Sequence, residues 1–131
     1  MILVDTSVWV DHLRQNDAAL VHSLERNAVS THPFIIGEIA LGNLQQRRVI
    51  IEALQALPGA IVASHEEVLL LIELHALSGS GIGYIDAHLL ASVRLQPGVL
   101  LWTRDKRLLA VTKRLGLAYQ PEADPVGSTE G

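Results

Sequence analysis

The sequence of 131 residues contains no cysteine. Disulfide frameworks, zinc ribbons, redox-active thiol pairs and thiol nucleophiles are therefore excluded, as is typical of proteins in a reducing cytoplasm. Long apolar runs are missing too. The longest aliphatic run covers residues 68–72, far below the roughly 18 to 20 residues that span a bilayer. No basic stretch precedes an apolar one at the amino end, so we expect no signal peptide, no membrane contact and a soluble, cytoplasmic protein.

An excess of basic residues is also missing. Lys and Arg number 10 against 14 Asp and Glu, and the net charge is -4. This balance argues against a protein that coats nucleic acid by bulk positive charge. If four carboxylates faced a divalent cation, the other ten would balance the ten basic residues. A nucleic-acid substrate therefore stays compatible with the composition.

Short apolar runs alternate with amphipathic stretches along the chain. Continuous apolar runs at residues 2–4 and 99–102 are typical of strands covered on both faces. Residues 60–63 form a similar run, and residues 29–31 form a weaker one. The stretches between them have helical periodicity with helix-start and helix-end signals. The predicted helices begin at Asp17 and Pro33 and cover residues 47–57, 64–74, 86–95 and 106–115.

This alternation predicts a single α/β domain with three layers, α/β/α, around a short, mainly parallel sheet. We expect the strands at 2–4 and 99–102 to be central and adjacent. The hydrophobic content of 49% is enough to fill one core. The domain is expected to cover residues 1–120, and the polar residues 121–131, with Pro and Gly, to form a flexible tail. In such sheets, ligands bind beyond the carboxyl ends of the strands.

Acidic residues occur at that edge of the predicted sheet. Asp5 follows the first strand and Asp105 follows the last, while Asp86 opens a predicted helix after a Gly-rich loop. Glu38 lies beside the apolar stripe of its helix. A cluster of like charges destabilises a fold unless a cation lies among them. Oxygen ligands without cysteine favour magnesium or manganese over zinc, and carboxylates with such a metal suit phosphoryl chemistry.

A simpler interpretation of some of these acids is structural. Asp is a favoured N-cap, so each of Asp5, Asp86 and Asp105, taken alone, is explained as a helix cap. Glu38 has no such explanation, because a cap does not lie in the middle of a helix. The six histidines are scattered without a metal-ligand spacing, so they are expected to be surface or loosely packed residues.

Four motifs together are distinctive. They are Asp-Thr-Ser-Val-Trp at 5–9, Glu38, Gly-Ile-Gly-Tyr-Ile-Asp-Ala-His-Leu-Leu-Ala-Ser at 81–92, and Leu-Trp-Thr-Arg-Asp-Lys-Arg-Leu at 101–108. In order and spacing, residues 1–119 resemble a PIN-domain ribonuclease of the VapC toxin type. The resemblance implies that four acidic residues bind one or two Mg²⁺ or Mn²⁺ ions and cleave RNA. These catalytic and metal-binding residues map onto Asp5, Glu38, Asp86 and Asp105.

The resemblance implies further residues and partners. Ser7 and Thr103 map onto supporting polar groups. A homodimer, an antitoxin that inserts a segment into the acidic groove, and a transfer or ribosomal RNA target are implied as well. From their place beside Asp105, the basic residues of this region are candidate RNA phosphate contacts. They are Arg104, Lys106 and Arg107.

The leading hypothesis is therefore a metal-dependent endoribonuclease that acts as the toxin of a toxin-antitoxin pair. A receiver-like, magnesium-binding signalling domain is a weaker alternative, because the predicted middle strand ends Ile-Val-Ala-Ser without an acceptor Asp. A phosphatase with an Asp-x-Asp-x-Thr motif fails because position 7 is Ser. A non-catalytic PIN fold that binds RNA or a protein partner stays open.

Overall fold

The computed structural model describes residues 1–121, so all but the first residue of the predicted tail at 121–131 lies outside the described part. This part contains three short strands and seven helices. The strands are β1 (Ile2–Val4), β2 (Val29–Ser30) and β3 (Leu100–Trp102). The helices are α1 (Thr6–Arg14), α2 (Ala18–Glu25), α3 (Pro33–Ala40), α4 (Arg47–Gln55), α5 (His65–Leu74), α6 (Tyr84–Leu95) and α7 (Lys106–Arg114).

The sheet is parallel, with strand order β2-β1-β3. Ile2 pairs with Val29 on one side and with Leu100 on the other. β1 is buried along its whole length, as its unbroken apolar sequence predicts. β1 and β3 are adjacent, as expected, but β3 is an edge strand rather than a central one. Its outer side makes a single bridge, between Leu101 and Ala118.

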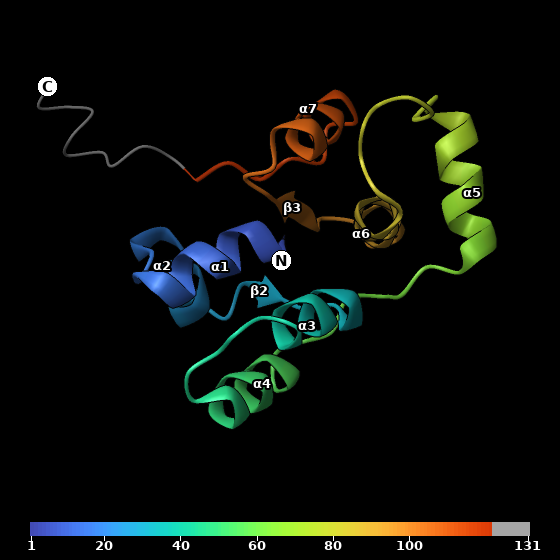
Figure 1. The fold of residues 1–131 in the computed structure, drawn as a ribbon. Helices are drawn as coiled ribbons and strands as arrows, with labels where there is room; N and C mark the ends of the chain where they lie inside the picture. Colours follow the sequence, from blue (N-terminus) through green and yellow to red (C-terminus); the bar gives the residue numbers. More distant parts are fainter. Residues whose placement is uncertain (122–131) are drawn as a thin grey trace, which may run out of the picture.

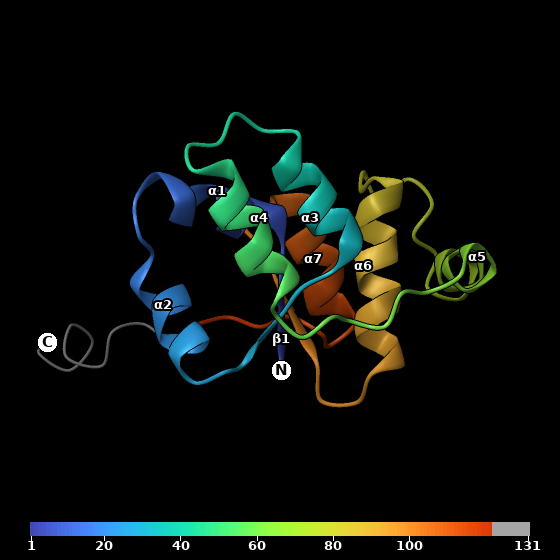
Figure 2. The same cartoon turned by 90° about the horizontal axis from the view of Figure 1, so that it is seen from below.

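Helices flank the sheet on both faces, which confirms the predicted three-layer α/β architecture. In Figure 1, α1 and α2 lie on one side of the strands, while α6 lies on the other with α5 outside it. The α3–α4 pair lies beyond β2, and α7 beyond β3. In Figure 2, β1 is labelled beside the N-terminus, below the labels of α1, α3, α6 and α7 in the view. These four helices are the ones that carry or follow the predicted acidic residues.

The predicted strand at residues 60–63 is wrong. The chain touches the sheet only where Gly59 forms a bridge with Thr31, and it then leaves the edge. Ile61 and Val62 are 48% and 49% exposed, so their apolar side chains do not enter the core. A β-branched run alone therefore does not make a strand where no neighbouring strand is long enough to pair with it.

Most helix starts follow their capping signals. Asp17 caps α2, and Ser64 and Glu67 form both hydrogen bonds of a capping box on α5. The predicted start of α6 is wrong, because this helix begins at Tyr84 with Gly83 as its N-cap. Asp86 is therefore the third residue of α6 and does not cap it.

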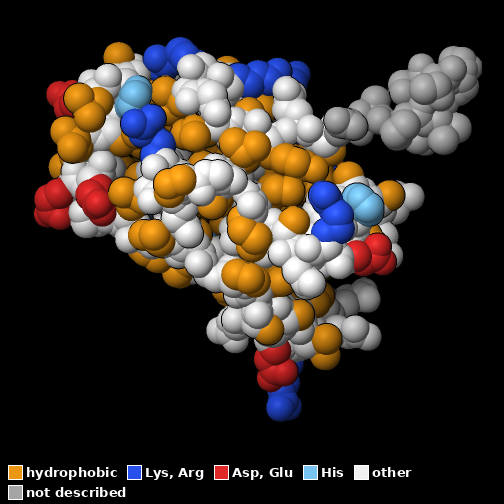
Figure 3. Space-filling model, turned by 180° about the vertical axis from the view of Figure 1, so that it is seen from behind, with side chains coloured by type: hydrophobic (Ala, Val, Ile, Leu, Met, Phe, Trp, Pro, Cys, Tyr) orange, Lys and Arg blue, Asp and Glu red, His pale blue; other side chains and the backbone are white. Residues whose placement is uncertain are grey.

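The surface carries apolar as well as charged side chains. Figure 3 shows hydrophobic side chains across the middle of the face opposite to that of Figure 1, with acidic and basic groups mainly toward its margins. Among the helices of the described residues, none has the length and apolar content needed to cross a membrane.

Candidate active site

The four predicted acidic residues share one electrostatic environment. The pKa of Asp86 is raised to about 6, first by burial and then by the negative charges of Asp5, Asp105 and Glu38, while a backbone hydrogen bond from Gly83 opposes the shift. These carboxylates come from four separate segments of the chain. The fold therefore places the charges of Asp5, Asp105 and Glu38 near enough to Asp86 to raise its pKa.

Asp5 is the most buried of these acids, with an exposure of 5%. It follows β1 and is the N-cap of α1. Its Oδ2 accepts hydrogen bonds from Ser7 Oγ (2.7 Å), from Thr103 Oγ1 (2.8 Å) and, more weakly, from Ser7 N (3.4 Å). No residue of the described part donates to Oδ1. One oxygen is thus held in place, and the other is available to a ligand.

Thr103 connects Asp5 to Asp105. Its hydroxyl donates to Asp5 and accepts the backbone N–H of Asp105 at 3.1 Å. Asp105 caps α7, because its Oδ1 accepts from Leu108 N at 2.9 Å. Asp5 and Asp105 are therefore helix caps, as their structural interpretation predicts. Both also act on the pKa of Asp86, so capping does not exclude a role in a metal site.

Glu38 lies in α3 and is held by a residue that the sequence analysis did not single out. Thr6 Oγ1 donates to Glu38 Oε1 at 2.6 Å, across 32 positions of the chain. Thr6 is the first residue of α1, between Asp5 and Ser7. The sequence signal that could have pointed to Thr6 is the Asp-Thr-Ser run at residues 5–7. The hydroxyls of Thr6 and Ser7 each donate to one of the predicted site carboxylates.

The donor set fits a hard divalent cation in its chemistry, because all four side chains offer carboxylate oxygens. Among residues 1–121, however, no three His, Cys, Asp or Glu side chains are arranged closely enough to hold one ion. Like charges keep apart when no cation separates them. For three or more of these side chains to hold one ion, the carboxylates must approach one another more closely than they do here.

No basic side chain of the described part neutralises the cluster by an ion pair. The ion pairs present there are Arg48 with Glu52, and Arg104 with Asp11 and with Asp17. The guanidinium of Arg104, a predicted phosphate contact, is thus bound to two carboxylates outside the acidic cluster. The other two predicted phosphate contacts, Lys106 and Arg107, are exposed on the first turn of α7.

Two histidines depart from the expectation of surface or loose packing. His32 and His88 are buried, and burial lowers the pKa of both, to about 4 for His32. His88 Nε2 lies 3.0 Å from the hydroxyl of Tyr84, whose other neighbour is His65 Nδ1 at 2.5 Å. This group joins the starts of α5 and α6 and supports the turn that carries Asp86.

Known proteins resemble this chain over most of its length. The family model described as PIN domain matches residues 2–114. The chain is 48% identical over 122 residues to Ribonuclease VapC32 of Mycobacterium tuberculosis strain CDC 1551 / Oshkosh, covering 93% of this chain and 98% of that protein. Ribonuclease VapC32 of strain ATCC 25618 / H37Rv matches with the same identity and coverage. The range that the family model matches, residues 2–114, contains the positions of all four acids.

The raised pKa of Asp86 predicts a pH-dependent stability. The ordinary pKa is 3.8 and the folded value is about 6, so the folded state binds the proton more tightly. The stability that the folded state gains from protonated Asp86 is fully present below pH 3.8 and is lost as the pH rises through about 6. With chelator present, Asp86→Asn should therefore raise the free energy of unfolding at pH 8 by about 1 to 2 kcal/mol, discounted for solvent screening.

Urea unfolding at pH 3.5, 6 and 8 measures this effect, with Glu25→Gln, an exposed acid on α2, as the control. The gain from Asp86→Asn should grow between the first and the last pH. A gain that is equal at all three pH values, or that the control reproduces, would contradict the prediction.

Proposed function

The chain belongs to the PIN-domain family and is a homologue of the VapC ribonuclease toxins, and from this premise we propose that Asp5, Glu38, Asp86 and Asp105 hold Mg²⁺ or Mn²⁺ for the hydrolysis of RNA. The observation that carries the proposal is the shared environment of the four carboxylates, expressed in the raised pKa of Asp86. The catalytic unit is residues 1–120, acting in the cytoplasm as the toxin of a toxin-antitoxin pair.

Each carboxylate has a distinct part in this site. Asp5 and Glu38 each have one oxygen fixed by a hydroxyl, which leaves the second oxygen for the ion or for its water. Asp105 is fixed through its cap on α7. Asp86 has the raised pKa, so it must lose its proton before it can act as a ligand, and metal affinity should rise with pH near 6.

A bound divalent ion would polarise a phosphate oxygen and lower the pKa of a water molecule, so that no side chain need serve as the nucleophile. The chain's own contribution is orientation. Ser7 and Thr103 act as supporting residues, because their hydroxyls hold Asp5 from two different elements. Glu38, held by Thr6, would hold the ion or orient the attacking water.

The RNA phosphates adjoining the cleavage point are proposed to bind at the start of α7. Lys106 and Arg107 are exposed there, directly after Asp105, and neither forms an ion pair with a described residue. The stem of Arg107 packs on Gly81, where a Cβ would lie 2.8 Å from Arg107 Cδ. This contact places the guanidinium beside the loop that leads to Asp86. Transfer or ribosomal RNA is the proposed target.

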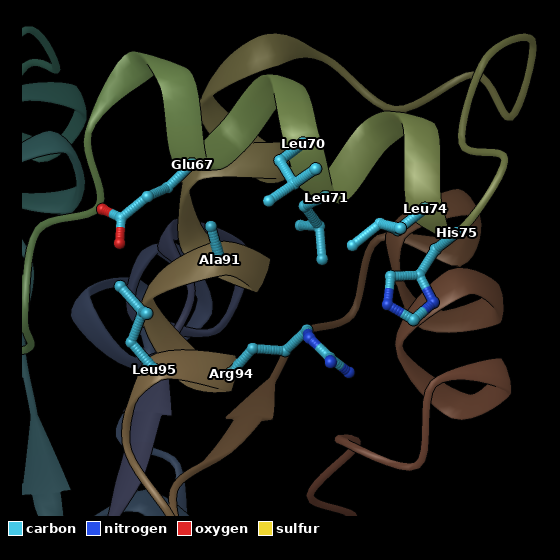
Figure 4. A pocket seen from close by; sticks show the side chains of 8 residues that line it. All are labelled: Glu67, Leu70, Leu71, Leu74, His75, Ala91, Arg94 and Leu95. Atoms are coloured by element: carbon cyan, nitrogen blue, oxygen red, sulfur yellow. The ribbon is translucent and has the colours of Figure 1, made fainter.

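A second copy of the chain is proposed to cover α5. Leu70 and Leu74 on this helix are 57% and 69% exposed. They line an apolar groove of about 210 Å³ between α5 and α6, which Figure 4 shows with Leu71, Ala91 and Leu95 as its other apolar walls. Glu67 and Arg94 lie on opposite helices of the same groove, so a twofold partner could pair the acid of one copy with the base of the other.

The dimer proposal predicts that Leu70→Glu and Leu74→Glu dissociate the protein into monomers, because each places a charge in an apolar interface. Both residues are exposed in the single chain, so the melting temperature of the monomer should change little. Sedimentation at micromolar concentration measures the effect. Leu41→Glu, at a residue that is 90% exposed and lies outside the groove, is the control. A wild type that is monomeric, or a Leu70→Glu variant that stays dimeric, would refute the proposal.

The antitoxin is proposed to bind the groove that leads away from Glu38. This groove, of about 620 Å³, lies between α1, α3 and α4. Its walls include Val10, Leu13, Ile39 and Ile50, and Glu38 is part of its lining. An apolar segment that ends in an arginine matches it, because a guanidinium satisfies carboxylates in place of an ion. A co-transcribed small protein should therefore bind, inhibit cleavage, and lose inhibition when that arginine becomes Met.

The metal site predicts a loss of activity from Asp5→Asn. The amide oxygen of Asn takes the place of Oδ2 and accepts the same hydroxyls, and Asn caps a helix as well as Asp does. The fold should therefore survive, while one ligand charge is lost and cleavage of RNA falls by about 100-fold or more. The assay measures Mn²⁺-dependent cleavage together with the melting temperature, with Glu66→Gln on α5 as the control.

Two results would be decisive against the metal site. One is an Asp5→Asn variant that cuts RNA at the rate of the wild type. The other is a wild-type activity that survives an excess of chelator.

A further inference from the structure

Arg104 stands between two residues of the site, Thr103 and Asp105, yet its side chain binds elsewhere. Its Nη1 donates to Asp11 Oδ2 at 2.8 Å and its Nη2 to Asp17 Oδ2 at 2.5 Å. We call these three residues the clamp. The guanidinium also lies over the ring of Trp102, 5.6 Å from its centroid. One side chain thus joins β3 to the end of α1 and the start of α2.

The clamp is stronger than an ordinary surface ion pair, which contributes little to stability. One fork-shaped cation serves two carboxylates, and the side chain of Asp17 is only 19% exposed. The other oxygen of Asp17 caps α2 by accepting from Leu20 N at 3.1 Å. Burial would raise the pKa of Asp17, but the Arg104 guanidinium and two backbone N–H groups lower it overall. Asp17 and Arg104 therefore stay ionised at neutral pH.

The backbone of Arg104 leads from the clamp directly into the acidic cluster. Its N–H donates to Ser7 Oγ at 3.0 Å, and Ser7 Oγ in turn donates to Asp5 Oδ2 at 2.7 Å. The residues on either side complete the connection, because Thr103 donates to Asp5 and also accepts from the N–H of Asp105. Any displacement of residue 104 therefore moves hydrogen-bond partners of the Asp5 carboxylate and of the Asp105 backbone N–H at once.

We infer that Arg104 is a positioning residue: by binding Asp11 and Asp17 it fixes residues 103–105, and through Ser7 and Thr103 it sets the placement of Asp5 and Asp105. This role replaces the phosphate contact that its position beside Asp105 predicts. The inference rests on the proposed function, because it concerns the carboxylates of that same metal site.

The two roles of Arg104 predict opposite effects when its acidic partners are removed. If Arg104 positions the site, loss of Asp11 and Asp17 charges loosens residues 103–105 and weakens metal binding. If Arg104 is a phosphate ligand held back by these acids, their removal frees it and RNA binds more tightly. Asp11→Asn/Asp17→Asn is a suitable double variant, because Asp11 is exposed and Asn still caps α2.

The experiment compares wild type, Arg104→Met, Arg104→Lys and the double Asn variant, with Arg48→Met as a matched control for a lone surface ion pair. Calorimetry with Mn²⁺ gives the metal affinity, and single-strand and transfer RNA pools give kcat and KM. Fluorescence anisotropy of labelled transfer RNA in chelator gives the RNA affinity at several salt concentrations. Circular dichroism gives the melting temperature of each variant.

A positioning role predicts that Arg104→Met lowers Mn²⁺ affinity and kcat by about 10-fold or more, as losing a residue that orients metal ligands does. KM for RNA and the salt dependence of RNA binding should stay unchanged. The double Asn variant should shift in the same direction, and Arg104→Lys should lie between Met and wild type, because Lys cannot bind both acids with a planar fork. Arg48→Met should change none of these quantities.

Three results would overturn the inference. The first is a drop of about one in the salt slope of RNA binding for Arg104→Met, which indicates a lost phosphate contact. The second is tighter RNA binding by the double Asn variant. The third is a Mn²⁺ affinity that is the same as in the wild type for Arg104→Met and for the double Asn variant. If the wild type itself neither binds Mn²⁺ nor cuts RNA, the proposed function fails and the inference with it; normal wild-type behaviour with unaffected variants refutes the inference alone.

Discussion

The hydrogen bonding of one buried carboxylate, that of Asp5, determines much of this structure. A charged group at 5% exposure is costly unless donors surround it. Ser7 comes from the helix that Asp5 caps, and Thr103 comes from the segment after β3. The sheet provides the second donor, because β1 and β3 pair with Val4 opposite Trp102, and Asp5 N donates to Trp102 O at 2.9 Å. The register of β1 and β3 thus places Thr103 where its hydroxyl can donate to the buried carboxylate of Asp5.

The same arrangement explains why the site uses hydroxyls rather than basic side chains around its acids. Thr6, Ser7 and Thr103 each donate to a carboxylate without adding positive charge. They orient the acids and leave the negative charge of the cluster in place. Burial raises the pKa of Asp86, and the remaining repulsion from Asp5, Asp105 and Glu38 raises it further. A salt bridge in the same position would have relieved the repulsion but also removed the attraction for a cation.

Sequence patterns predicted the parts of the fold that depend on local signals. Apolar continuity predicted β1 and its pairing with β3, and capping residues predicted the start of α2 and α5. The strand expected at residues 60–63 failed because strand formation depends on a partner, and the short edge strand β2 offers only Thr31 for one bridge. Asp86 was misplaced at the start of α6 because Gly83 caps without a side-chain signal.

For the site, the motifs identified the acids but not the contacts that hold them. Thr6 and Glu38 lie 32 positions apart, and Arg104 lies 93 positions from Asp11 and 87 from Asp17. Such pairs become visible only once the helices are placed. Proximity in sequence does not reveal the ion-pair partners of Arg104, which is adjacent to Asp105 in the chain but binds Asp11 and Asp17. Nothing in residues 101–108 alone distinguishes a cation that faces RNA from one that faces its own protein.

The charge distribution links activity to inhibition. Within residues 1–121, every ion pair lies outside the acidic cluster, and Arg104, the neighbour of Asp105 in the chain, is bound to Asp11 and Asp17. The cluster therefore keeps its negative charge and must take a cation from outside the chain. A carboxylate cluster without a cation of its own attracts a divalent metal ion and the guanidinium of a partner protein for the same electrostatic reason. We propose that the two compete for it, and that the binding of Arg104 to Asp11 and Asp17 leaves the cluster open to either.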